Sequence, residues 1–344
     1  MYKNGSRVVM DIAASDSLNR VKMRSDSFDG KHVEHVESAT NTKADIHKTN
    51  IGTVINNKKR NAPIGLFDSG VGGLSVYLHL AQQLPAEHYV YYADTLNVPY
   101  GNRDSADIEA LTLTAVDWLY EQGCKLIVIA CNSASAYALE TARRRYPQLP
   151  IVGLVPALKP AISASKTGRV VVLATKATLN GTLLNEVIDH FAKPNNTVVT
   201  KYFDPQLVPW VEAGMPEQDD TALRLRQQLT LFAHDGVDQL VLGCTHYPFF
   251  KTFLLDEIAQ QRLAMQVVDS GQAIAERVKQ LLAANQLSAL VDNTSDDHCL
   301  EITDKTKVVI RPPLIFYATK FDDKLGTLIA RLLGKDAILQ YYSE

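Results

Sequence analysis

The sequence predicts an α/β protein of two similar α/β domains with mainly parallel sheets, related by a pseudo-twofold axis. Three observations support this prediction. Short apolar runs recur from residue 64 onward, and segments with helical hydrophobic periodicity separate them. Two of these runs end in a cysteine within matching stretches of sequence, which indicates an internal repeat. The first 62 residues show neither feature.

Eight apolar runs are short enough to be buried strands. Two of the intervening segments have helical periodicity, residues 74–84 and 108–122. In parallel sheets the functional loops lie at the carboxyl ends of the strands, so functional residues are expected there. The expected strands cover residues 64–67, 89–93, 125–130, 151–155, 169–174, 197–203, 239–243 and 265–269.

The chain, at 344 residues, is long enough to bury two cores of ordinary size. Residues 1–62 are rich in Ser, Asp, Asn, Lys and His. We expect them to form a polar, mostly disordered N-terminal extension, because ordering them would bury little apolar surface. We assign residues 63–157 plus 273–344 to a first domain, which carries Cys131, and residues 158–272 to a second.

Composition indicates a globular, cytoplasmic protein. Hydrophobic residues make up 46% and charged residues 21% of the chain, and the net charge of −3 argues against nucleic acid or a membrane as the main partner. No apolar stretch reaches the ~20 residues of a membrane-spanning helix, and acidic residues come too early for a signal-peptide core. Four cysteines do not make a disulfide framework in a chain of this length and fit free thiols in a reducing compartment.

The two cysteine-bearing stretches are GCKLIVIACNSA, which begins at Gly123, and GVDQLVLGCTHY, which begins at Gly236. An offset of 113 residues relates the two glycines and also the two cysteines, Cys131 and Cys244. An amphipathic helical segment precedes each stretch. We infer a repeat in which each domain contributes one thiol to an active site in the cleft between the domains.

Two thiols at one cleft suggest three chemistries. A metal site is expected to have more Cys or His at ligand spacing, and neither stretch contains a C-x-x-C pair. A disulfide is disfavoured in the cytosol. The third chemistry is an acid and a base on opposite faces of one substrate carbon. A thiol, with an ordinary pKa of about 8.5, can take either role when its surroundings lower that pKa.

Further candidates follow other predicted strands. The stretch DSGVGG places Asp68 and Ser69 after the first strand, and its glycines let backbone N–H groups bind an anion, either a phosphate or a carboxylate. Asp68 suits a group that orients or deprotonates a thiol, and equally a turn or capping aspartate. Thr175 and Thr178 follow another strand, where hydroxyls bind ligands or cap the next helix. The spacing around Glu212 alone favours a solvated helix residue.

Five stretches, in this order and spacing, resemble the aspartate/glutamate racemase family: DSGVGGLSV, PYG, ACNSAS, VGLVPALKPA and GCTHYP. The resemblance covers about Ile64 to Val278. It implies two similar α/β domains with the active site between them, and racemisation of glutamate without cofactor or metal. It also implies that the product, D-glutamate, enters bacterial peptidoglycan.

The resemblance also implies a role for each candidate residue. Cys131 would remove the α-proton of D-glutamate with help from Asp68. Cys244 would remove that of L-glutamate with help from His246 and Glu212. The residues implied to hold the substrate are Asp68, Ser69, Tyr100, Gly101, Asn132, Ser133, Thr178, Thr245 and His246.

The chain departs from the family pattern in three places. Ser133 stands where threonine is usual, residues 1–62 form a longer extension than expected, and the segment after Val291 matches no family motif. The runs at 308–310 and 314–318 nevertheless indicate folded structure in that segment. The VPALKPA stretch resembles a branch in which a cell-wall precursor activates some members. An activator and a homodimer are therefore left open as partners beside glutamate.

Three other functions compete with this one. Aspartate racemase shares the two-thiol logic, but His246 after Cys-Thr favours glutamate, because the aspartate relatives resemble Gly-Cys-Thr-Glu there. A thiol hydrolase would use Cys244 and His246 as nucleophile and base and has no use for Cys131. A small-anion binding protein built on the glycine loop predicts binding without turnover.

Overall fold

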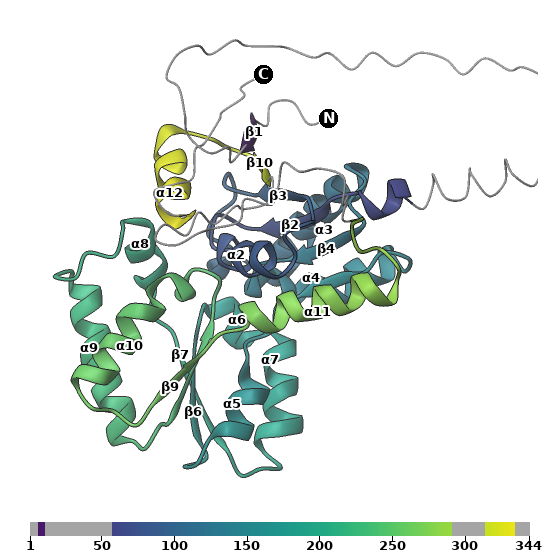
Figure 1. Cartoon of the computed structure of the whole chain (residues 1–344). Helices are drawn as coiled ribbons and strands as arrows, with labels where there is room; N and C mark the ends of the chain where they lie inside the picture. The colour runs from purple at the N-terminus through teal and green to yellow at the C-terminus, as the bar shows by residue number, and fades with distance from the viewer. Residues whose placement is uncertain (1–5, 11–56, 291–313, 334–344) are drawn as a thin grey trace, which may run out of the picture.

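Two mainly parallel sheets, each covered by helices, form the framework of the chain (Figure 1). The computed structural model describes residues 6–10, 57–290 and 314–333. The first sheet has the order β1-β10-β3-β2-β4-β5, in which β1 is antiparallel to β10 and the other pairs are parallel. Its strands are β1 (Ser6–Met10), β2 (Ile64–Asp68), β3 (Tyr89–Ala93), β4 (Leu126–Ile129), β5 (Ile151–Gly153) and β10 (Leu314–Ala318).

The second sheet is fully parallel and has the order β7-β6-β8-β9. The predicted fold class is confirmed by these two sheets. The strands are β6 (Arg169–Ala174), β7 (Val198–Tyr202), β8 (Gln239–Gly243) and β9 (Gln266–Val268). The α-helices of both halves are α2 (Leu74–Gln83), α3 (Ser105–Glu121), α4 (Asn132–Arg145), α5 (Leu158–Ala164), α6 (Lys176–Asn180), α7 (Thr182–Val187), α8 (Leu207–Glu212), α9 (Asp220–His234), α10 (Lys251–Gln260), α11 (Gly271–Ala284) and α12 (Asp323–Leu333).

The two sheets share one strand order. In the first sheet β3-β2-β4-β5 are neighbours, and in the second β7-β6-β8-β9 are, so that the second, first, third and fourth strand of each half lie side by side. The strand β4, which precedes Cys131, therefore occupies the same place as β8, which precedes Cys244. The repeat seen in the sequence is a repeat of topology.

Continuous apolar sequence explains why these strands lie at the centre of each half. All residues of β2, β4 and β8 are buried, as expected for strands covered by helices on both faces. The helices before β4 and β8 bury one apolar face each, with Val116 and Leu119 on α3 and Leu225 and Leu229 on α9. Burying each such side chain contributes roughly 1.5–3 kcal/mol to the free energy of unfolding, relative to leaving it exposed.

Several ends differ from the expected ones. The strand expected at 125–130 covers only Leu126–Ile129, and the run at 314–318 forms β10. Ser6–Met10, inside the segment expected to be mostly disordered, pairs as β1 with β10. The sequence SRVVM has two adjacent valines, which favour a strand. The run at 308–310 lies outside the described residues.

The domain boundaries assigned from the sequence stay predictions. The chain passes from the first sheet to the second after β5 and returns after β9 into α11, and Ser270 donates a hydrogen bond to the carbonyl of Val155 where the two crossings meet (3.2 Å). No helix among the described residues has the length and apolar character needed to cross a bilayer.

Candidate active site

A cavity of about 330 Å³ lies between the two halves and is lined by residues that follow strands of both sheets. Among the predicted site residues, only Asp68 is absent from its lining. The predicted residues that line the cavity are Ser69, Tyr100, Gly101, Cys131, Asn132, Ser133, Thr178, Glu212, Cys244, Thr245 and His246.

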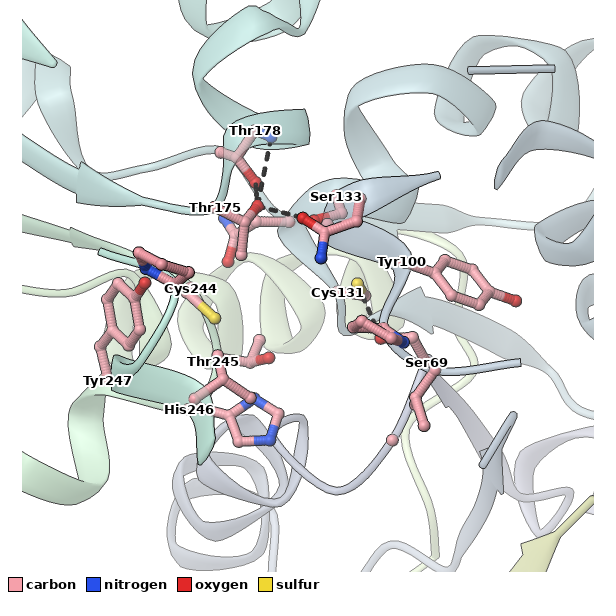
Figure 2. Close-up of a pocket in the computed structure, with 18 of the residues that line it drawn as sticks. Ser69, Tyr100, Cys131, Ser133, Thr175, Thr178, Cys244, Thr245, His246 and Tyr247 are labelled. Atoms are coloured by element: carbon pink, nitrogen blue, oxygen red, sulfur yellow. Dashed lines mark hydrogen bonds between the residues drawn. The ribbon is translucent and has the colours of Figure 1, made fainter. Parts of the chain in front are cut away.

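Cys131 and Cys244 bring their sulfur atoms to opposite sides of this cavity (Figure 2). Cys131 follows β4 and is the N-cap residue of α4, and Cys244 directly follows β8. Both are free thiols and largely buried, with 6% and 7% of their surface exposed. The equivalent strand ends therefore place one thiol on each side of a shared space.

The surroundings of Cys131 favour the neutral thiol. Burial, and to a smaller extent the nearby carboxyl group of Asp68, raise the pKa of Cys131 to about 12. The backbone N–H of Ala134 donates to its sulfur at 3.5 Å, and the Ser69 hydroxyl lies 3.6 Å away. These two contacts lower the pKa, but less than burial raises it.

Asp68 lies behind the cavity wall. It is fully buried and accepts hydrogen bonds from the backbone N–H of Gly70 (2.7 Å) and from the Thr245 hydroxyl (3.1 Å). Burial raises the pKa of Asp68 to about 6, although the charge of His246 and these hydrogen bonds oppose the rise. Because Thr245 belongs to the other half, Asp68 links the two halves and acts on Cys131 by its charge.

The surroundings of Cys244 supply a cation. Burial lowers the pKa of His246, but hydrogen bonds with Cys244 and Glu212 outweigh it and raise that pKa to about 10. His246 Nε2 lies 3.1 Å from Glu212 Oε1. At neutral pH His246 is therefore an imidazolium beside Cys244.

Glu212 is partly solvated, as its spacing alone favours, with 45% of its side chain exposed, and it also contacts the cavity. Its helix α8 is only six residues long and buries Leu207, Trp210 and Val211. Glu212 is the last residue of that helix, and its side chain turns to the cavity wall, where it meets His246. Helical periodicity does not reveal which way a side chain points at a helix end.

Hydrogen-bonding groups line the space between the sulfurs. Asn132 Nδ2 is buried and has no hydrogen-bond partner among the described residues. Ser133 and Thr175 hydroxyls lie 2.9 Å apart, and those of Thr175 and Thr178 lie 3.0 Å apart (Figure 2). Thr175 also caps α6, which is one of the two roles considered for this pair of threonines. An unpaired amide and a chain of hydroxyls suit a substrate carboxylate.

Tyr100 lines the cavity, and its hydroxyl has a partner in the protein. Its hydroxyl donates to Asp94 Oδ2 at 2.6 Å and points away from the two sulfurs (Figure 2). The ring therefore contributes to the cavity wall, and the hydroxyl is engaged elsewhere.

Several lining residues were not assigned from the sequence. Asp204 is the notable one, because it is buried and charged; Gln206 N donates to its Oδ1 (2.8 Å), and Arg224 forms an ion pair with it (3.4 Å). It comes soon after β7, so its place near a strand end was a usable signal. The other unassigned lining residues include Val98, Asn102, Phe203, Val208, Pro209 and Tyr247.

The charge of the cavity wall is unusual for an anion site. No lysine or arginine of the described residues lines it, and His246 is its cation. Within the described ranges, no three His, Cys, Asp or Glu side chains gather in a way that could hold a metal ion.

Comparisons with known proteins agree on one family. The family model described as Asp/Glu/Hydantoin racemase matches residues 64–278. The chain is 46% identical to the glutamate racemase of Deinococcus radiodurans over 242 residues, which cover 70% of this chain and 82% of that one. It is 42% identical to the glutamate racemase of Pseudomonas aeruginosa over 228 residues, which cover 66% and 84%.

Solved structures give the same result. The glutamate racemase of Francisella tularensis in complex with D-glutamate superposes with a TM-score of 0.64 and 26% identity over 80% of this chain and 94% of that one. The Escherichia coli glutamate racemase in complex with L-glutamate and the activator UDP-MurNAc-ala has a TM-score of 0.61 and 30% identity, over 82% and 100%.

Proposed function

Because the chain belongs to the Asp/Glu/Hydantoin racemase family, we propose that it interconverts L-glutamate and D-glutamate by proton transfer at the α-carbon. The observation that carries this proposal is the pair of thiols, Cys131 and Cys244, on opposite sides of one cavity. In a two-base inversion, a base takes the proton from one face of the carbon and an acid supplies another proton to the opposite face.

The two ends of the cavity suit these two roles. In the L-to-D direction, the thiolate of Cys244 takes the α-proton, the electron pair of the C–H bond stays on the α-carbon, and the thiol of Cys131 gives its proton to the other face. The high pKa of Cys131 keeps it protonated for this step. The imidazolium of His246 places a positive charge beside the Cys244 sulfur and the developing carbanion. In the D-to-L direction the roles are exchanged.

Neutral donors hold the substrate in this proposal. The amide nitrogen of Asn132, unpaired among the described residues, and the hydroxyls of Ser133 and Thr178 bind the carboxylates, because no lysine or arginine of the described residues lines the cavity. Asp68 sets the charge behind Cys131 from a distance.

The enzyme acts in the cytoplasm, and its product, D-glutamate, is used for peptidoglycan. A cell-wall precursor activates the enzyme. The free thiols of the described cysteines support a reducing compartment. The Escherichia coli relative, whose structure contains the activator UDP-MurNAc-ala, supports the second part. A homodimer stays a prediction.

Proton NMR in heavy water tests the reaction. Purified protein and L-glutamate are mixed with no added cofactor, and early samples are resolved into enantiomers. Early D-glutamate is expected to carry deuterium at the α-carbon, while unreacted L-glutamate keeps its hydrogen. Product that retains the original hydrogen would contradict two opposed thiols, and tight binding without turnover would favour an anion-binding protein.

A further inference from the structure

The C-terminal helix α12 reaches the second half of the molecule. It follows β10, a strand of the first sheet, and lies beside α8 (Figure 1). Arg331 on its last turn donates from Nη1 to the backbone carbonyl of Glu212 at 3.3 Å. This helix lies beyond residue 278, outside the segment that the family model matches.

The turn after α8 lies directly against the side chain of Arg331. Gly214 has φ +95°, and a Cβ atom there would lie 2.7 Å from Arg331 Nη1. A side chain at position 214 would therefore displace the guanidinium as well as strain the backbone. Both contacts place the Arg331 side chain at the carboxyl end of α8.

Glu212 needs such support because of its position. It ends a six-residue helix, where backbone carbonyls lack partners within the helix. Its carboxylate must nevertheless stay within hydrogen-bonding distance of His246, and its side chain is 45% exposed. On the other side, Ile329, Leu332 and Leu333 bury the inner face of α12 and make the helix a firm support.

We propose that Arg331 is a positioning residue that holds the backbone at Glu212, so that the Glu212 carboxylate stays against His246 on the Cys244 side of the cavity. This inference rests on the proposed glutamate racemisation. An exposed arginine that only ties two helices together would contribute to stability alone, so the test needs a readout specific to one side of the cavity.

Isotope effects provide that readout. Deuterium at the α-carbon of L-glutamate is removed by Cys244, and that of D-glutamate by Cys131. The two enantiomers have equal free energy, so kcat/KM falls equally in both directions when any one step slows. The isotope effect can change differently in the two directions, because it reports which of the two proton transfers limits the rate.

The variant Arg331→Met keeps an apolar stem and removes the donor, and Arg331→Lys keeps a donor and the charge. Lys324→Ala is the matched control, because it removes one exposed positive charge from the first turns of the same helix. We expect Arg331→Met to lower kcat/KM about tenfold, Arg331→Lys to recover part of it, and Lys324→Ala to match wild type. In Arg331→Met the isotope effect on kcat/KM increases for deuterated L-glutamate and decreases for deuterated D-glutamate.

Equal isotope effects in Arg331→Met and wild type, at a reduced rate or at an unchanged rate, would overturn the proposal. NMR of protein with ¹⁵N-labelled histidine gives a second measurement that needs no turnover. The ¹⁵N signal of His246 Nε2 is expected to move toward the unbonded position in Arg331→Met and not in Lys324→Ala; an unmoved signal also overturns the proposal. If the wild-type protein does not racemise glutamate, the proposed function fails first, and that result is visible before any variant is made.

Discussion

The Cys131 end and the Cys244 end of the cavity come from equivalent strand ends, yet they carry different charges. Behind Cys131 lies the buried carboxyl group of Asp68, and beside Cys244 lies the imidazolium of His246 with Glu212. The residue after each cysteine also differs, because the amide nitrogen of Asn132 has no hydrogen-bond partner in the part of the chain that the structure describes, while the Thr245 hydroxyl donates to Asp68. The shared topology determines where the two sulfur atoms lie, and the few residues that differ between the two halves determine the charges around them.

This difference suits a reaction that needs an acid and a base at the same moment. Two thiols in identical surroundings would share one ionisation state. The carboxyl group of Asp68 adds to the burial that raises the pKa of Cys131, and the imidazolium of His246 lies at the Cys244 end, so the two sulfurs have different electrostatic surroundings. The following predictions test whether the two ends differ as described.

The largest effect is expected from the cysteines themselves. Cys131→Ala and Cys244→Ala should each lower racemisation by about 10³-fold or more, in both directions, because each direction needs an acid and a base. Chiral chromatography of the reaction measures this. Cys124→Ala, which changes a buried thiol outside the cavity, serves as the control. A Cys131→Ala variant that works at near the wild-type rate would remove Cys131 from the mechanism and leave a Cys244–His246 pair to explain the activity.

The second prediction concerns Asp68 and the stability of the fold. Its folded pKa of about 6 lies above the ordinary 3.8, so the folded state binds this proton more tightly than the unfolded state. Protonated Asp68 therefore stabilises the folded state below about pH 4, and this stabilisation is lost as the pH rises through 6. Between pH 4 and pH 8, the unfolding free energy of Asp68→Asn should therefore rise relative to wild type by up to about 3 kcal/mol.

Urea titrations at the two pH values measure this difference. Asp238→Asn is a control of opposite sign, because hydrogen bonds from Ser165 and the backbone of Lys166 lower the pKa of Asp238 against its burial. The stability contribution of Asp238 is present at high pH and is lost as the pH falls. Equal pH dependence of wild type and Asp68→Asn would show that Asp68 has an ordinary pKa.

Much of this arrangement could be predicted from the sequence, because it depends on local patterns. Apolar runs located the strands of the described core within one or two residues at most ends, and the repeat of Gly123–Cys131 at Gly236–Cys244 indicated a shared cleft. Chain-local patterns cannot show contacts between distant segments. The pairing of β1 with β10 depends on such a contact.

The limits of sequence reasoning are clearest at two residues. Glu212 was implied by family resemblance while its own spacing favoured a solvated position, and only the end of α8 explains how it meets His246. Tyr100 was implied to hold the substrate, and the sequence does not show that its hydroxyl donates to Asp94. Hydrogen-bond direction depends on neighbours that are set by the tertiary fold.

A third prediction addresses the cation at the Cys244 end. Hydrogen bonds with Cys244 and, second, with Glu212 raise the pKa of His246 from 6.5 to about 10; Glu212→Gln removes the charge of the second partner, so the imidazolium should be lost at lower pH. We expect activity at pH 8 to fall about thirtyfold, and the alkaline limb of the pH–rate profile to move toward neutral pH. Glu217→Gln, at an exposed glutamate in the next turn, is the control. An alkaline limb that stays in place would separate Glu212 from the ionisation of His246.

The smallest effect is expected at Asn132, in the position equivalent to Thr245. Its amide nitrogen is buried and unpaired in the described residues, so the substrate is the partner that it lacks. Asn132→Ala should raise the KM for glutamate about fivefold with little change in kcat, because this contact is made before and during proton transfer alike. The same variant should keep or slightly raise the unfolding free energy, by up to about 1 kcal/mol, since an unsatisfied donor is removed. Thr245→Val should do the reverse and lower it, because Asp68 loses a hydrogen bond. If Asn132→Ala instead lowers stability and leaves KM unchanged, the amide has a structural partner, and the two equivalent positions serve the fold alike.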